Sequence, residues 1–212
     1  MLIRPRGMTN SRPDVLAQIQ PKPLTVAHIR DVAELHFKQL PWSFNGQFGK
    51  EHILELYTAL AASPHFFGYV FYVEGRLLGF VTATTDYADS RRLLSKVFNR
   101  KIWALLKVFA RHPRFLLTAL ESKFLVPLVF RWHGARAEWL TFVTDTSQAY
   151  LGPFVALRLI EALNEHMSMA GIRVYMAQGY KNNPKAMRYY EKLRWRVAAS
   201  LLMHNVYCWT TG

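Results

Sequence analysis

The chain has 212 residues, of which 51% are hydrophobic and 19% are charged, and its formal net charge at pH 7 is +13. A chain of this length and apolar content can bury a core as one domain, so global disorder and two large domains are excluded. The single cysteine, Cys208, excludes an internal disulfide and a multi-cysteine zinc site. We therefore expect a cytoplasmic protein.

The N-terminal arm, residues 1–13, is basic and polar and is expected to be disordered. It lacks the apolar stretch of a secretory signal, and no later apolar run approaches the ~20 residues that span a bilayer. The sequence also lacks the Walker A, Rossmann, nucleophile-elbow and zinc-protease motifs. Its histidines do not occur at metal-ligand spacing, so we expect no metal.

The first part of the chain predicts a strand followed by two helices. Val15–Gln20 is expected to form the strand, which the prolines that follow it would end. Apolar residues at helical spacing predict a helix from Thr25 and a second one over Lys50–Ala62. The segment between them, Pro41–Gly49, is rich in turn-forming and aromatic residues and predicts a loop.

The middle of the chain predicts a hairpin followed by helices. Phe66–Val73 and Arg76–Thr84 are aromatic or β-branched runs joined by two residues, which is typical of a β-hairpin. Arg91–His112 has an apolar stripe and a basic stripe at helical spacing, which predicts one amphipathic helix. Pro113 would end that helix, and a second apolar helix is expected to continue to about Phe130.

The last third of the chain predicts alternating strands and helices. We expect a strand over Glu138–Val143, a helix from Gly152 that ends before Gly171, a strand over Arg173–Ala177, a helix over Asn183–Leu193, and a hairpin of Val197–Leu202 with Val206–Trp209. This order of elements favours an α/β fold with a mixed sheet of about seven strands, flanking helices and a basic helical insert.

The most specific motif lies near the C-terminus. Residues 183–195 run Asn-Pro-Lys-Ala-Met-Arg-Tyr-Tyr-Glu-Lys-Leu-Arg-Trp. The segment resembles the N-x-x-A-x-x-[FY]-Y-x-K-x-G-[FW] signature of the GNAT N-acetyltransferase superfamily, except that Arg194 replaces the glycine. The resemblance covers roughly Val15–Val81 and Ala137–Trp209. It implies one acyltransferase domain, residues 1–212, interrupted by a helical insertion over residues 88–135.

The resemblance also implies a site for acetyl-CoA, the acetyl donor of the family. In GNAT proteins a bulged strand, here Ala137–Val143, precedes a pyrophosphate-binding loop, here Thr144–Pro153. Free N–H groups and the helix dipole at Leu151–Val155 would attract a diphosphate independently of the family name. An ordinary helix start is the alternative, because leucine and proline occupy two positions of the family's loop pattern. The expected donor-binding residues are Phe142, Val143, Thr144, Gln148, Ala149, Tyr150, Leu151, Gly152, Pro153, Asn183 and Tyr189.

The catalytic residues follow from the same resemblance. Tyr190 would be the general acid that protonates the departing CoA thiolate, because a phenol can donate at neutral pH; a packed helix aromatic is its alternative role. Glu138 and Asp86 are the candidate bases, with a water chain as the alternative. Asp145 is expected to support the turn. Backbone N–H groups near Phe142–Thr144 would hold the pantetheine and polarise the thioester carbonyl.

Positive charge is concentrated in one segment. Between Arg91 and Arg131 the chain has ten Lys or Arg residues and one acid, Glu121. The predicted helix therefore has the composition of a segment that lies on an anionic membrane surface. Packing on the domain itself or on a second subunit, and binding to an acidic acyl carrier protein, stay open, whereas nucleic acid is disfavoured because the segment is so apolar. The four charges expected to form the basic stripe are Lys96, Arg100, Lys107 and Arg111.

The sequence therefore predicts an N-acetyltransferase that moves acetyl from acetyl-CoA to a primary amine of a small molecule or amino sugar. Two alternatives remain open: transfer of a long acyl chain from an acyl carrier protein, and a non-catalytic membrane-associated module with the same fold. Peripheral attachment to a membrane and a homodimer are further expectations. Trp42, Phe44 and Phe48 could cover the acceptor or simply pack within their loop. No transferable motif identifies the acceptor.

Overall fold

The computed structural model describes residues 20–148 and 150–210. Within them seven strands form one mixed sheet in the order β1-β2-β3-β4-β5-β7-β6. The strands are β1 (Lys22–Pro23), β2 (Phe66–Val73), β3 (Arg76–Thr84), β4 (Ala137–Thr144), β5 (Val174–Tyr180), β6 (Arg196–Ser200) and β7 (His204–Thr210). All neighbouring pairs are antiparallel except β4 and β5, which are parallel. The predicted α/β class and seven-stranded mixed sheet are confirmed.

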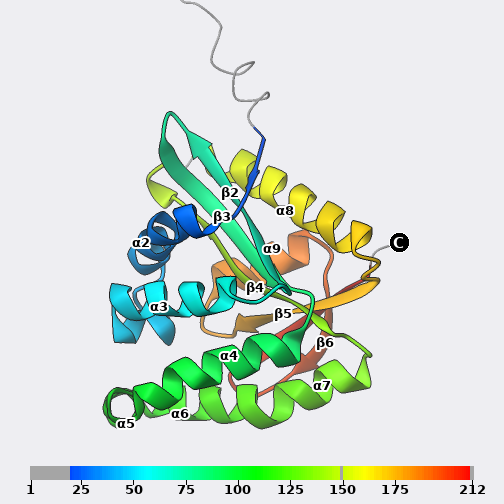
Figure 1. Cartoon of the computed structure of the whole chain (residues 1–212). Helices are drawn as coiled ribbons and strands as arrows, with labels where there is room; N and C mark the ends of the chain where they lie inside the picture. The colour runs from blue at the N-terminus through cyan, green and yellow to red at the C-terminus, as the bar shows by residue number, and fades with distance from the viewer. Residues whose placement is uncertain (1–19, 149, 211–212) are drawn as a thin grey trace, which may run out of the picture.

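Helices cover both faces of this sheet (Figure 1). Before the hairpin lie α2 (Ile29–Gln39) and α3 (Lys50–Ala61), and after β4 lie α8 (Gly152–Met169) and α9 (Pro184–Lys192). Between β3 and β4 the chain forms the insert, which comprises α4 (Tyr87–Arg100), α5 (Ile102–Arg111), α6 (Pro113–Leu120), the π-helical turn η3 (Glu121–Leu125) and α7 (Val126–Trp132). Short 3-10 turns are η1 (Val26–His28), η2 (Asn45–Phe48) and η4 (Thr146–Gln148).

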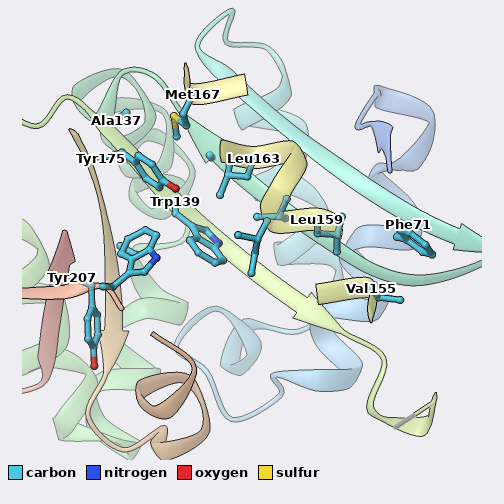
Figure 2. Packing of buried hydrophobic residues seen from close by; sticks show 14 of the residues in the cluster. Phe71, Ala137, Trp139, Val155, Leu159, Leu163, Met167, Tyr175 and Tyr207 are labelled. Carbon is cyan, nitrogen blue, oxygen red and sulfur yellow. The ribbon is translucent and has the colours of Figure 1, made fainter. Parts of the chain in front are cut away.

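Two clusters of buried side chains hold α8 and α2–α3 to opposite faces of the strands. The larger joins α8 and α9 to β2–β5 and β7, and Figure 2 shows Val155, Leu159, Leu163 and Met167 of α8 turned toward the strands. Gly79 on β3 allows this close approach, because a Cβ there would lie 2.7 Å from the Val155 side chain. On the other face, α2 and α3 pack on β2, β3 and β4.

The edge strand β1 differs from the prediction. Residues 15–19 of the expected strand Val15–Gln20 lie outside the described residues, and Gln20 is not in a strand. Instead Lys22 pairs with Val70, and Pro23 with Tyr69. Proline is tolerated here because β1 lies at the edge of the sheet, where one side of the strand needs no hydrogen-bond donors.

The single amphipathic helix predicted over Arg91–His112 is also wrong. The chain turns between α4 and α5 at Lys101, whose ammonium group lies 2.5 Å from the Glu55 carboxylate of α3. The expected basic stripe is therefore divided between two helices, with Lys96 and Arg100 on α4 and Lys107 and Arg111 on α5. The second helix after Pro113 is confirmed, and it continues through the π-helical turn to Trp132.

The insert is fastened to the body of the domain at two places. At one, the buried Glu121 carboxylate accepts hydrogen bonds from the backbone N–H of Met203 (2.8 Å) and from His204 Nδ1 (2.9 Å). Burial lowers the pKa of His204 despite this carboxylate, so the imidazole donates as a neutral group. Nearby, Val126 and Phe130 of α7 belong to the cluster that covers β5 and β7.

At the other place, an aromatic cluster joins α4, α5 and α6 to the loop over Pro41–Gly49. The Phe44 ring lies 5.4–6.0 Å from Phe48, Phe98, Phe109 and Phe115, measured between ring centroids. Phe44 and Phe48 therefore pack on each other and on the insert, as expected for a packed loop, and whether this loop also covers an acceptor stays a prediction. Trp42 is 37% exposed.

The C-terminus of α9 forms a tight cap without the glycine of the family signature. Arg194 has φ 59°, in the left-handed region, and Trp195 N–H donates to the carbonyl of Tyr190 at 3.0 Å. The left-handed conformation costs a residue with a Cβ roughly 1–2 kcal/mol. The cap therefore places Trp195 in the core at the expense of local strain.

Arg194→Gly is expected to stabilise the protein by about 0.5–1 kcal/mol, because relief of the left-handed strain exceeds the entropy that glycine adds to the unfolded chain. Urea unfolding of the two proteins measures the difference. Lys192→Gly, within the last turn of the same helix, is the control and should destabilise. A lower stability of Arg194→Gly than of the parent would contradict the assignment of strain to Arg194.

Candidate active site

The site lies where β4 and β5 separate. These parallel strands pair only over Ala137–Trp139 and Tyr175–Ala177, although β4 continues to Thr144 and β5 to Tyr180. Beyond the paired residues, the backbone groups on the β5 side of β4 have no strand partner among the described residues. An extended ligand can therefore hydrogen-bond to β4 in the gap, much as a strand would.

A bulge in β4 lies directly at this separation. Ala83 of β3 pairs with Trp139 and Thr82 pairs with Thr141, which leaves Leu140 without a partner on β3. A bulge changes the face to which the following side chains point. As a result Trp139 and Phe142 both lie on the α8–α9 side of the sheet.

Glu138 is a buried carboxylate on the opposite face from Trp139. Its side chain accepts a hydrogen bond from Gln178 Nε2 at 2.6 Å, and the residue is 5% exposed. Burial raises its pKa to about 7, although the Gln178 amide and the Arg91 guanidinium oppose the shift. A carboxylate with this pKa can accept a proton near neutral pH, as general base catalysis requires.

Residues of the insert complete the surroundings of Glu138. Ser122 of the π-helical turn donates to Gln178 Oε1 at 3.3 Å, so one chain of hydrogen bonds runs from the insert to Glu138. The Arg91 guanidinium donates to the Ser122 carbonyl and to the Tyr87 hydroxyl. The charge of Glu138 contributes to the raised pKa of Tyr87, which places these groups within electrostatic reach.

Tyr190 of α9 is held in a cage of aromatic rings. Its ring stacks on Tyr207 at 4.3 Å and lies 5.7 Å from Trp139 and 5.4 Å from Trp195, measured between centroids. Burial raises its pKa, and the Glu138 charge adds to the shift. The phenol therefore stays protonated at neutral pH and close enough to Glu138 to sense its charge. Gly179 leaves room for the cage, since a Cβ there would lie 2.9 Å from Tyr207 and 3.3 Å from Tyr190.

The loop that follows β4 is held by Asp145, as expected. Its carboxylate accepts from Arg76 Nη2 (2.5 Å), Gln39 Nε2 (3.2 Å) and the Ser147 N–H (3.0 Å). Burial alone would raise the pKa of Asp145, but the bonds from Ser147 and Arg76 hold it below its usual value. The loop is therefore fastened to α2 and β3 before α8 begins.

The loop ends at the N-terminus of α8, where the two unusual residues of the predicted loop lie. Leu151 is buried in the core below α8. Pro153 carries no N–H, which leaves Gly152 and Phe154 as the first-turn residues that can offer one. A Cβ on Gly152 would meet no atom within 4 Å, so this position can accept a side chain without a clash.

The remaining predicted donor residues have varied surroundings. Phe142 stacks on Tyr189 at 5.3 Å with nearly parallel rings, Tyr150 is exposed, and Ala149 lies outside the described residues. Asn183 caps α9, because its Oδ1 accepts from the Ala186 N–H. Val143 is buried on the α2–α3 side, whereas Thr144 and Gln148 are half-buried at the end of β4 and in η4.

Asp86, the second candidate base, caps α4. Its Oδ1 accepts from the N–H groups of Ala88 (2.8 Å) and Asp89 (3.0 Å). These bonds give the Asp86 carboxylate a structural role as a helix cap. The pKa of the other candidate base, Glu138, is raised by burial. The sequence analysis missed Gln178, which lies 40 positions after Glu138 in the chain. It also missed Ser122, which lies 56 positions before Gln178.

Comparison with known proteins shows which fold this arrangement of strands and helices belongs to. No protein-family model and no curated protein matches the chain. Among solved structures, the polyamine N-acetyltransferase of Drosophila melanogaster is 14% identical, with a TM-score of 0.60 over 92% of this chain and 100% of that one. The PaiA N-acetyltransferase of Thermoplasma acidophilum, in complex with coenzyme A, is 11% identical, with a TM-score of 0.56 over 92% and 99%. The chain has the GNAT fold.

A third GNAT-fold structure is the aminoglycoside N-acetyltransferase AAC(6')-Iy in complex with CoA, which is 12% identical with a TM-score of 0.55 over 88% of this chain and 93% of that one. At these identities the similarity establishes the fold. Over residues 20–148 and 150–210, no group of three or more His, Cys, Asp or Glu side chains is arranged to hold a metal ion.

Glu138→Gln is expected to remove a pH-dependent loss of stability. A folded-state pKa raised from 4.5 to about 7 means that the Glu138 contribution is fully present below pH 4.5 and is lost as pH rises through about 7. From pH 4 to pH 8, the free energy of unfolding of the variant should therefore rise by about 3 kcal/mol relative to that of the parent. Urea unfolding at both pH values measures this change, and the amide oxygen of the substituted side chain can still accept the bond from Gln178. If the difference in free energy of unfolding between variant and parent is the same at pH 4 and pH 8, the pKa of Glu138 is not raised by folding.

Proposed function

We propose that this GNAT-fold chain is an N-acetyltransferase that transfers acetyl from acetyl-CoA to a primary amine of a small molecule or amino sugar. The observation that carries the proposal is the placement of Glu138, with a pKa of about 7, and the protonated phenol of Tyr190 at the separation of β4 and β5. A carboxylate that accepts a proton and a phenol that donates one are the two groups that aminolysis of a thioester needs.

The donor would bind along the separated edge of β4. The pantetheine would follow the backbone near Phe142–Thr144, and the diphosphate would lie at the N–H groups of Gly152 and Phe154. The dipole of the 18-residue helix α8 favours negative charge at this end. A β4 backbone N–H directed at the thioester oxygen would stabilise the developing oxyanion.

The reaction would then require one proton to leave the amine and one to reach the sulfur. The neutral amine attacks the thioester carbonyl, and Glu138 accepts the proton that the new C–N bond displaces, directly or through water. When the tetrahedral intermediate collapses, the C–S bond breaks and Tyr190 donates its proton to the thiolate. The products are the amide and CoA; Glu138 releases its proton to solvent and Tyr190 recovers one from solvent, so both groups return to their starting states.

The acceptor would approach Glu138 from the insert side of the sheet. There the polar groups of Gln178, Ser122 and Tyr87 surround the carboxylate. The similar structures are named for polyamine and aminoglycoside substrates, which supports a small polar amine as the acceptor class. A cytoplasmic location stays a prediction from the single, half-buried Cys208.

Tyr190→Phe is expected to lower kcat for acetyl transfer by about 10²-fold, because the ring keeps its packing while the proton donor is lost. The Kd for acetyl-CoA should stay nearly unchanged. Steady-state kinetics with a panel of amines measures kcat, and calorimetry with acetyl-CoA in the absence of amine measures the Kd. Tyr72→Phe, on β2 away from the separation of β4 and β5, removes a hydroxyl that bonds only Asp31 among the described residues; it is the control and should keep parent activity. Parent turnover by Tyr190→Phe would remove the assignment of Tyr190 as the acid.

A long acyl chain on an acyl carrier protein is the second candidate donor. Pro153 removes one N–H from the diphosphate site, and the basic insert would suit an acidic carrier protein. This donor would place less demand on the N-terminus of α8.

The donor test uses Gly152. CoA is expected to raise the Tm more than pantetheine without phosphates at the same concentration. Gly152→Asp should weaken CoA binding by about tenfold or more through charge repulsion, while the helix dipole tolerates the new carboxylate. Gly152→Asn is the neutral control of the same size. Equal shifts with CoA and pantetheine, together with acyl-carrier turnover that Gly152→Asp leaves intact, would favour the carrier-protein donor.

A further inference from the structure

The insert exposes large apolar side chains along α5, α6, the π-helical turn and α7. Trp103 on α5 is 77% exposed and Trp132 at the end of α7 is 89% exposed. We call this surface the outer face of the insert; Figure 1 shows the α6–α7 stretch running along the border of the molecule. Its apolar members are Ile102, Trp103, Leu106, Leu116, Leu117, Leu120, Phe124, Leu125, Leu128 and Trp132.

This exposure is a property of the folded insert. The inward side of the same helices is already buried through Phe115, Val126 and Phe130, and Glu121 ties the π-helical turn to β7. In α6 and α7, the outward residues alternate with these inward ones at helical spacing. The outer face therefore cannot be covered by rotating the helices without unpacking the inner one.

The charge of the outer face is uniformly positive. Lys107, Arg111, Arg114, Lys123 and Arg131 are exposed among the apolar residues. Glu121, the only acid of the segment 91–131, is buried on the inward side and bonded to His204. Asp89, on α4 of the insert, pairs with Arg92 and is largely buried, and Glu55, on the neighbouring helix α3, pairs with Lys101. An anionic partner would therefore meet no exposed carboxylate of the insert.

The apolar surface continues past α7 to the edge strand β6. A shallow groove between them is lined by Leu128, Val129, Trp132, His133, Ala198 and Ala199. The apolar surface thus extends from α5 to the edge of the sheet.

A bilayer with anionic lipids fits these features better than a protein does. A second copy would bring the same basic residues into contact across a two-fold axis, which like charges oppose. Tryptophans with exposed rings, aliphatic residues between them and interspersed Lys and Arg are instead typical of segments that lie in the membrane interface. Among the described residues no helix is long and apolar enough to cross a bilayer.

We propose that the outer face of the insert, formed by α5, α6, the π-helical turn and α7, docks on an anionic lipid bilayer. The apolar side chains enter the headgroup region, and the surrounding Lys and Arg side chains contact lipid phosphates. The docking is independent of the acetyl-transfer function, because it requires only the exposed surface and its charge.

The experiment uses the full chain and vesicles of two compositions. The protein should sediment with vesicles of equal parts phosphatidylcholine and phosphatidylglycerol at low salt, with a blue shift of tryptophan fluorescence. It should not sediment with phosphatidylcholine alone. Binding should weaken as salt rises, because the Debye length falls from about 10 Å at 0.1 M to about 3 Å at 1 M.

Paired variants separate the outer face from the rest of the surface. Lys107→Gln/Arg131→Gln should weaken binding by roughly 25-fold, since each interfacial charge contributes about a factor of five. Lys22→Gln/Arg30→Gln, on β1 and α2, removes the same charge elsewhere and should bind like the parent. Phe124→Ser/Leu128→Ser should abolish the fluorescence shift, whereas Leu157→Ser/Met169→Ser on α8 should retain it. The two insert residues and the two α8 residues changed in these variants have similar exposed fractions, 54–74%.

Thermal unfolding verifies that each variant is folded before vesicle binding is compared. The proposal is overturned if the parent ignores acidic vesicles at low salt, or if the insert variants bind as tightly as the α2 and α8 controls. It is also overturned if Phe124→Ser/Leu128→Ser dissociates a dimer in size-exclusion chromatography while vesicle binding is absent in the parent. In that case a second copy covers the face.

Discussion

The separation of β4 from β5 after Trp139 is the constraint on which the rest of the molecule depends. Up to that residue the two parallel strands share hydrogen bonds; beyond it, each strand has one side without a strand partner among the described residues. The bulge at Leu140 re-aims the side chains of β4, so that Trp139 and Phe142 close one face while Glu138 stays on the other. An open backbone edge, a buried acid and a buried phenol therefore lie near the division of the sheet, with the acid close enough for its charge to raise the pKa of the phenol.

The insert contributes side chains to the region where β4 and β5 separate, although it lies outside the sheet. Its π-helical turn presents Ser122 to Gln178 and Glu121 to His204, so two successive side chains connect one surface helix to β5 and β7. Such turns interrupt a regular helix and are frequent at functional sites. The outward side of the same helices carries the apolar and basic residues proposed to contact lipid. One structural element therefore carries both the surface proposed to contact lipid and side chains beside the candidate base, and α7 packs it onto the core.

Much of the fold could be predicted because local patterns agree with tertiary placement. The hairpin of β2 and β3, the helices α2, α3, α8 and α9, and the final hairpin all follow from periodicity and turn residues. The exceptions have identifiable causes. The turn at Lys101 is accompanied by an ion pair with Glu55, 46 positions earlier in the chain, which no helical period encodes. The strand β1 contains proline because it lies at an edge, and edge position is a property of the assembled sheet.

The sequence by itself determined the class of the fold and the position of Tyr190, because the signature around Asn183–Trp195 carries fixed spacing on one helix. It also named Glu138 as one of two candidate bases and located the excess charge in one segment. Only the tertiary structure distinguished Glu138 from Asp86, since burial beside Gln178 raises one pKa and helix capping occupies the other carboxylate. The structure also decided which side chains of the insert face outward. Burial and long-range hydrogen bonds depend on which residues the folded chain brings together, and a one-dimensional pattern does not record that.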